Sequence, residues 1–221
     1  MKAKKVLALL LTVIMVVALV ACGGGGGNTT PDTPEEKTCV IYCPNPLESL
    51  NAYIVVGYPS GHVCNCIYEP LLWIKEDGSY EPCLAESWEV SDDALTYTFH
   101  LVKNATFHDG TPVTAKDVKF SYEWAPQFPQ GKKPTAMVDH VDVVDDYTVK
   151  IVCAYLDPCF MEFVNNMRIY SKDYVETKAS DPEMKMEENG SGPYKLTETD
   201  GTTHAFLEAY EDYRKGAPNV K

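Results

Sequence analysis

The strongest constraint on the fold is a set of short runs in which apolar and polar residues alternate, joined in pairs by turn sequences. In LTYTFHL, residues 95–101, the apolar side chains occupy every second position, which is the period of a strand with one buried face. The run ESWEV, residues 86–90, precedes it, and the linking SDDA has the composition of a tight turn. The sequence therefore predicts a β-hairpin here, and the same pattern predicts further hairpins over residues 137–155 and 193–209.

The segment HDGTPVTAKDVKFSYEW, residues 108–124, predicts a turn that leads directly into a helix. Asp109 and Gly110 supply the turn, because glycine tolerates a positive φ. Thr114 is the expected N-cap, with Asp117 three residues later acting as the acid of a capping box. Pro126 should end the helix. The expected buried stripe at helical spacing is Ala115, Val118, Tyr122 and Ala125.

The other elements are shorter and complete an α+β fold of hairpin-rich mixed sheets with short helices. Two helices are expected, one from Ser60 to Tyr68 and one with Asp157-Pro158 as N-cap and first position. Residues 178–192 have the composition of a polar linker. Strands are expected at residues 38–42, 71–74 and 167–171.

The first 21 residues predict a targeting signal. Lys2, Lys4 and Lys5 precede an apolar run that ends in LVAC at Cys22, and this run is short for a membrane-spanning helix, which needs ~20 apolar residues. The arrangement resembles a bacterial lipobox, which implies cleavage before Cys22 and lipid on its sulfur and its new amine. An ordinary cleaved secretory signal is the alternative.

Residues 22–37 predict a flexible tether, since five glycines are followed by proline, threonine and acidic residues. As a random coil this segment would reach ~20 Å. The folded domain is then expected at residues 38–221, outside the cytoplasm and close to a membrane surface to which the lipid anchors it.

The charge of the chain excludes one class of partner. The formal net charge is −13, and removal of three signal-peptide lysines takes it to −16. An acidic domain repels phosphate backbones, so we expect no nucleic-acid partner.

Cysteine and histidine raise the questions of disulfides and metal. Seven cysteines follow Cys22, and we expect most of them to be buried apolar side chains, with one or two disulfides among them. The candidate metal ligands are His62, Cys64 and Cys66, although a helix would align just the first and the last of them. The expected Cys-x-x-Cys pairs of zinc sites are missing, so buried thiols are the competing interpretation.

The sequence gives no support for an enzyme. It has neither a Gly-x-x-x-x-Gly-Lys phosphate loop nor a Gly-x-Ser-x-Gly nucleophile elbow. Its five histidines are scattered. We expect no catalytic site and no cofactor.

Several longer motifs resemble the bacterial extracellular solute-binding proteins of family 5, the oligopeptide, dipeptide and nickel receptors of ABC importers. They are IYEPLL at 67–72, LAESWEVSDDALTYTFHL at 84–101, FHDGTPVTAKDVKFSYE at 107–123 and GSGPYKL at 190–196. The resemblance extends over about residues 39–221. It implies the first lobe of a type II periplasmic-binding-protein-like fold, with the second lobe missing from this chain.

The resemblance also carries expectations about the site. It implies that the turn and helix at 108–124 are scaffold and touch no ligand. The ligand residues it suggests are Gly57, Tyr58, Pro59, Ser191 and Gly192. It implies a short peptide as ligand and an ABC permease and ATPase as partners. Because one lobe leaves much of a ligand in water, weak or absent binding by this chain alone is expected. A nickel or metal-chelate receptor and a non-transport surface lipoprotein that binds another subunit are the alternatives.

Overall fold

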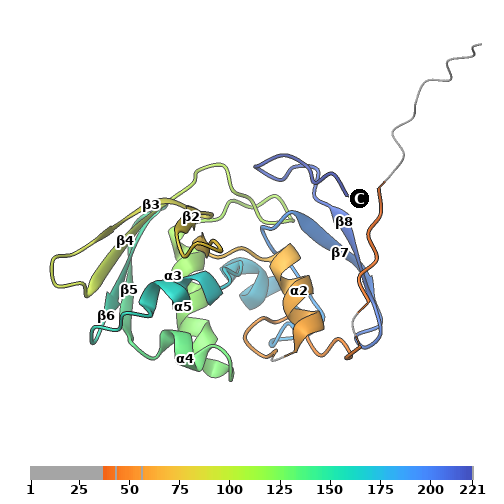
Figure 1. Cartoon of the computed structure of the whole chain (residues 1–221), viewed down its shortest axis with the longest axis horizontal. Helices are drawn as coiled ribbons and strands as arrows, with labels where there is room; N and C mark the ends of the chain where they lie inside the picture. The colour runs from red at the N-terminus through yellow and green to blue at the C-terminus, as the bar shows by residue number, and fades with distance from the viewer. Residues whose placement is uncertain (1–36, 43, 56, 221) are drawn as a thin grey trace, which may run out of the picture. The chain divides into compact units, whose positions relative to one another are not determined.

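The structure, a computed structural model, describes residues 37–42, 44–55 and 57–220, which form the predicted α+β arrangement of antiparallel strands and short helices (Figure 1). The helices are α2 (Tyr58–Ile67), α3 (Ala115–Trp124), α4 (Lys132–Thr135), α5 (Phe160–Asn166), the 3-10 helix η1 (Ala125–Gln127) and the π-helix η2 (Tyr174–Lys178). The strands are β1 (Leu72–Ile74), β2 (Tyr80–Pro82), β3 (Ala85–Val90), β4 (Thr96–Leu101), β5 (Val138–Asp145), β6 (Thr148–Cys153), β7 (Tyr194–Thr199) and β8 (Ala205–Ala209).

A four-stranded antiparallel sheet in the order β3-β4-β6-β5 supports much of the core. Two of the predicted hairpins, β3–β4 and β5–β6, form its halves, and β4 pairs with β6 so that Phe99 opposes Val149. Both of these side chains are fully buried, and Tyr97 and Leu101 are buried on the same face. The alternation in the sequence therefore identified the inner face of the sheet correctly. The third predicted hairpin is also present, as the separate pair β7–β8.

Helix α3 packs against β5 and β6 through the stripe that the sequence predicts. The capping box is present, since Asp117 Oδ2 accepts from the backbone nitrogen of Thr114 at 2.9 Å and from its hydroxyl at 2.8 Å. The turn before it also forms as expected, with Gly110 at φ +84°. The α-helix ends just before Pro126, which lies inside η1.

Two predicted strands do not form. Residues 38–42 belong to no strand in the described part of the chain, and Val40, Ile41 and Tyr42 are 94%, 71% and 87% exposed. Residues 167–171 are buried but irregular, because Ile169 N donates to Glu69 O and Tyr170 N to Ser121 Oγ rather than to a neighbouring strand. Both segments have the apolar composition of a strand, but a strand also needs a partner for its backbone groups.

Two predicted helices form but begin at other residues than expected, and two further details of the prediction differ from the structure. Helix α2 begins two residues before Ser60, whose hydroxyl instead accepts from Glu48 N at 3.0 Å. Helix α5 begins three residues after Asp157, which forms a turn with Cys159 N. Strand β1 was expected, whereas its partner β2 was not. The predicted polar linker at 178–192 contains buried side chains, those of Met184, Asn189 and Ser191.

Candidate functional site

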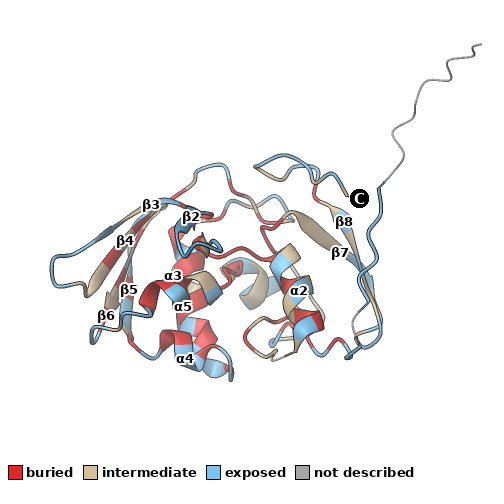
Figure 2. Cartoon of the chain, in the orientation of Figure 1, coloured by how far each residue is buried: buried red, intermediate tan, exposed pale blue. Residues whose placement is uncertain are grey.

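One side of α2 is open to solvent and carries side chains suited to contact with a small molecule. Tyr58, His62 and Asn65 lie at i, i+4 and i+7, which places them on one helical face. Tyr58 is 81% exposed, and its ring lies 5.7 Å from that of His62. His62 and Asn65 are also exposed, and Figure 2 shows exposed and buried residues alternating around α2. We call Tyr58, His62 and Asn65 the α2 face.

The sequence around the first turn of α2 explains why this face is presented outward. Gly57 is the N-cap in an extended conformation, and Pro59 follows at the start of the helix, where its missing N–H costs nothing. The opposite side of α2 carries the buried residues Ser60, Cys64 and Ile67, which anchor it to the core. Of the predicted ligand residues, Gly57 and Pro59 therefore position Tyr58 and shape the helix start.

Beyond Asn65 the α2 face meets a buried arginine. Arg168 lies on the irregular segment after α5 and is 7% exposed. Its Nη2 donates to Asn65 Oδ1 at 2.6 Å, and its guanidinium carbon stands 4.8 Å from the ring centroid of Trp73 on β1. Nothing in the local sequence distinguished Arg168 as a site residue, because its neighbours come from distant parts of the chain.

Ser191 and Gly192, also predicted as ligand residues, lie at the C-terminal end of α2, whereas Gly57, Tyr58 and Pro59 lie at its N-terminal end. Gly192 N donates to Ile67 O at 2.7 Å, and Ser191 is buried with its hydroxyl on Glu69 Oε2 at 3.2 Å. A ten-residue helix is about 15 Å long. The structure therefore does not gather the five predicted ligand residues into one cluster, and a ligand role for the second pair stays a prediction.

Ser191 belongs to a buried network centred on an ion pair that the sequence did not predict. Arg214 Nη1 binds Glu69 Oε2, and the two side chains are 4% and 2% exposed. Tyr213 OH donates to Glu69 Oε1 at 2.8 Å, and Arg214 Nη2 donates to Cys83 O at 3.0 Å. This network fastens the chain after β8 to the end of α2. The one local signal was an acid inside the apolar run IYEPLL.

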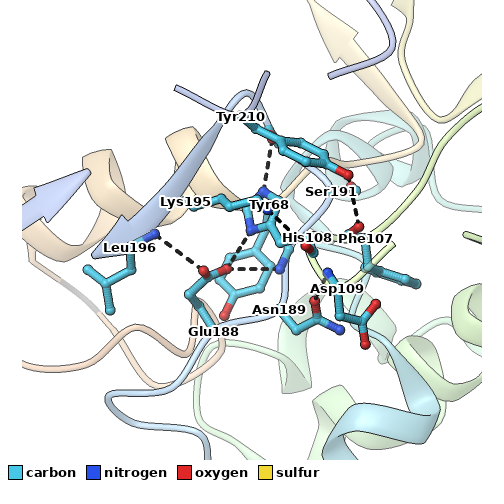
Figure 3. A network of polar contacts seen from close by, with 12 residues as sticks. Tyr68, Phe107, His108, Asp109, Glu188, Asn189, Ser191, Lys195, Leu196 and Tyr210 are labelled. Carbon is cyan, nitrogen blue, oxygen red and sulfur yellow. Dashed lines mark hydrogen bonds and ion pairs between the residues drawn. The ribbon is translucent and has the colours of Figure 1, made fainter. Parts of the chain in front are cut away.

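A second buried network surrounds His108 (Figure 3). His108 Nδ1 lies 2.6 Å from Glu188 Oε2 and Nε2 lies 3.0 Å from Gly192 O. Both ring nitrogens therefore lie at hydrogen-bonding distance from an oxygen atom. Lys195 Nζ donates to His108 O at 2.9 Å. The network ties the turn at 107–110 to the segment 188–195, in agreement with a scaffold role for that turn.

The candidate metal ligands do not converge. His62 is exposed on the α2 face, whereas Cys64 is buried and donates to Leu50 O at 3.2 Å. Within the part of the chain that the structure describes, no group of three or more His, Cys, Asp or Glu side chains could hold a metal ion. Burial raises the pKa of the Cys64 thiol to about 12, which disfavours the thiolate that metals require.

The cysteines agree with the expectation of buried thiols in part. Cys64, Cys83 and Cys153 are buried, whereas Cys39 and Cys159 are exposed. Each of these five, and the half-buried Cys66, is a free thiol. Cys43 lies outside the described residues.

The signal, the tether and Cys22 also lie outside the described residues. Among the helices that the structure does describe, none has the length and apolar character needed to cross a membrane.

Comparison with known proteins identifies the family to which this chain belongs. Residues 79–221 match the profile of the bacterial extracellular solute-binding proteins, family 5 Middle. The chain is 32% identical over 208 residues to heme-binding protein A of Haemophilus influenzae, a match that covers 80% of this chain and 37% of that protein. It is 29% identical over 151 residues to the periplasmic oligopeptide-binding protein OppA of Escherichia coli, covering 59% of this chain and 27% of the relative.

Solved structures give the same result. The oligopeptide-binding protein AppA from Bacillus subtilis, in complex with a nonapeptide, matches with a TM-score of 0.71 and 27% identity, over 77% of this chain and 36% of that one. NikA from Brucella suis, in complex with Fe(III)-EDTA, matches with a TM-score of 0.72 and 26% identity, over 81% of this chain and 37% of that one.

The class that these matches define is a non-enzymatic solute receptor. The chain belongs to the bacterial extracellular solute-binding proteins of family 5. It spans about 37% of the length of heme-binding protein A and a smaller share of OppA.

Proposed function

We propose that this chain is a lipid-anchored receptor component that captures short peptides outside the cytoplasm and delivers them to an ABC permease. Peptide-binding proteins recur among its relatives, and two of those are named as periplasmic. In this proposal residues 1–21 are removed, Cys22 carries the lipid and residues 22–37 form the tether. Mass spectrometry of the N-terminal peptide tests the lipid anchor. An uncleaved N-terminus with an unmodified Cys22 contradicts lipid anchoring.

The α2 face is the observation that carries the proposal. Seven residues of helix separate Tyr58 from Asn65, a rise of about 10 Å. An extended peptide advances about 3.3 Å per residue, so the α2 face matches about three residues of a peptide. An exposed tyrosine beside an imidazole offers both an apolar ring and polar tips for such a ligand.

We expect this chain to bind its peptide weakly when it acts alone. High affinity for a small solute requires most of its surface to be buried. The α2 face is an exposed surface of one helix, and it leaves the far side of the peptide in water. Polar groups on that side gain little by leaving water.

Calorimetric titration of the full chain, purified in detergent, with trialanine tests the function. The expected dissociation constant is above about 100 μM, which corresponds to less than ~5.5 kcal/mol of binding free energy. Tyr58→Ala should weaken binding further, because it removes the most exposed ring of the α2 face. Tyr155→Ala, at a tyrosine that is 51% exposed elsewhere, is the matched control and should bind like the unmodified chain.

Three outcomes speak against this proposal. Absence of peptide binding at millimolar concentrations refutes peptide capture by this chain. Equal losses in Tyr58→Ala and Tyr155→Ala refute the α2 face as the site. Binding of Ni(II)-histidine in place of trialanine favours the metal-chelate alternative.

A further inference from the structure

The guanidinium of Arg168 is buried among neutral partners. Nη1 donates to the carbonyl of Asn165 at the end of α5, and Nη2 donates to the side-chain amide oxygen of Asn65, each at 2.6 Å. The ring of Trp73 covers the guanidinium at 4.8 Å. These contacts fix the position of the group and partly satisfy its donors, but none of them brings a negative charge.

The titratable groups around Arg168 do not supply that charge either. Those that interact with it are Tyr53, Cys64, Cys83 and Tyr170. Burial raises the pKa of Cys64 and of Cys83 to about 12, and it also raises the pKa of both tyrosines. All four groups are therefore neutral at pH 7. Within the described residues no Asp or Glu lies within ion-pair distance of Arg168.

This situation is unusual in a chain with 32 acidic residues and a net charge of −13. The other buried arginine described above, Arg214, pairs directly with Glu69. A buried charge without a partner is costly, and burial holds the pKa of Arg168 below its usual value. The carbonyl at the end of α5 offsets part of the cost, but α5 has only seven residues and ends in neutral side chains.

The guanidinium of Arg168 keeps N–H donors that could serve an anion, and one of its two hydrogen-bond partners is an exposed side chain. Two of the five N–H donors of the guanidinium are used in hydrogen bonds. Asn65, which covers Nη2, is exposed, and its side chain can turn away into solvent. A carboxylate matches the planar edge of a guanidinium and binds it with two parallel hydrogen bonds.

We propose that Arg168 anchors a carboxylate of the solute at the end of the α2 face, where the carboxylate displaces the amide oxygen of Asn65 from Nη2. The inference rests on the proposed function and narrows it, since it assigns the solute a carboxylate, such as the C-terminus of a short peptide. The rest of the peptide then runs from Asn65 towards His62 and Tyr58. Arg168 supplies the charge, and Trp73 keeps the guanidinium plane fixed.

The first test supplies the missing charge from within the chain. Asn65→Asp places a carboxylate on the side chain that already contacts Nη2. An acid in the last turn of a helix is otherwise destabilising, so a higher melting temperature than that of the unmodified full chain would identify a true countercharge. Asn166→Asp adds the same charge at the exposed end of α5 without a contact to Arg168, and it should not raise the melting temperature. This design leaves Arg168 in place, because its removal could unfold the domain.

The second test compares trialanine with trialanine amide on the same three proteins. The unmodified chain and Asn166→Asp should bind the acid about tenfold to a hundredfold more tightly than the amide, the value of one or two hydrogen bonds to a charged group. Asn65→Asp should lose this preference, because its own carboxylate occupies the guanidinium.

The outcomes distinguish failure of the Arg168 carboxylate anchor from failure of the proposed peptide capture. Equal binding of acid and amide overturns the anchor and leaves the peptide receptor standing. If neither peptide binds but sodium acetate stabilises the unmodified chain and not Asn65→Asp, the anchor stands and peptide capture fails. If Asn65→Asp is no more stable than Asn166→Asp and no carboxylate binds, the anchor is refuted.

Discussion

Replacement of Arg214 by methionine is expected to lower the free energy of unfolding by about 3–5 kcal/mol, the usual cost of breaking a buried ion pair. The variant leaves Glu69 as a carboxylate that is 2% exposed and has lost its cation. It also leaves Cys83 O without its donor from Nη2. Urea denaturation followed by tryptophan fluorescence measures the loss.

Two controls show whether the charge is responsible. Lys119→Met breaks an exposed pair with Glu123, whose charged atoms lie 3.6 Å from those of Lys119, and should cost no more than about 0.5 kcal/mol. The double variant Arg214→Met with Glu69→Gln removes the stranded charge but keeps an acceptor for Tyr213, so it should recover part of the loss. Equal costs for Arg214→Met and Lys119→Met would show that the Glu69–Arg214 pair does not hold the segment after β8.

Gly190→Ala is expected to destabilise the fold by about 3 kcal/mol or more, at the upper end of the range for overpacked sites. A Cβ at this position would stand 2.0 Å from Ile67 O and 2.7 Å from Ile67 C, which are backbone atoms at the end of α2. To remove this steric clash, the segment 188–195 must separate from α2. That movement would also disturb the contact between His108 and Glu188.

Gly61→Ala is the matched control, because Gly61 lies inside α2 and a methyl group added there would meet nothing within 4 Å. Alanine at a helix interior is favoured over glycine, so this variant should be more stable by about 0.5–1 kcal/mol. Thermal unfolding of both variants gives the comparison. A Gly190→Ala protein as stable as the unmodified chain would mean that the close approach to Ile67 is not required.

The parts of the fold that could be predicted are those that local chemistry determines. The hairpins follow from alternation and turn residues, and α3 follows from Thr114, Asp117 and a buried stripe. Residues 38–42 and 167–171 show the limit of this approach. Their composition suits a strand, but pairing depends on partners elsewhere in the chain, and no such pairing is made by either segment as described.

The candidate site was predictable to a smaller extent. Tyr58 was identified through the family resemblance and lies on an exposed face. Arg168 was missed because its partner Asn65 is 103 residues away. The buried pairs were missed for the same reason, since 80 residues separate His108 from Glu188 and 145 separate Arg214 from Glu69. Buried polar contacts between distant segments leave no periodic signal in the sequence.

The most direct test of the central claim is an NMR titration of the full chain with trialanine, observed at assigned backbone and side-chain resonances. We expect progressive shifts at Tyr58, His62 and Asn65 and at the Arg168 guanidinium, with saturation above about 100 μM peptide. Shifts confined to the β5–β6 hairpin, or saturation at micromolar peptide or below, would contradict peptide capture by the α2 face.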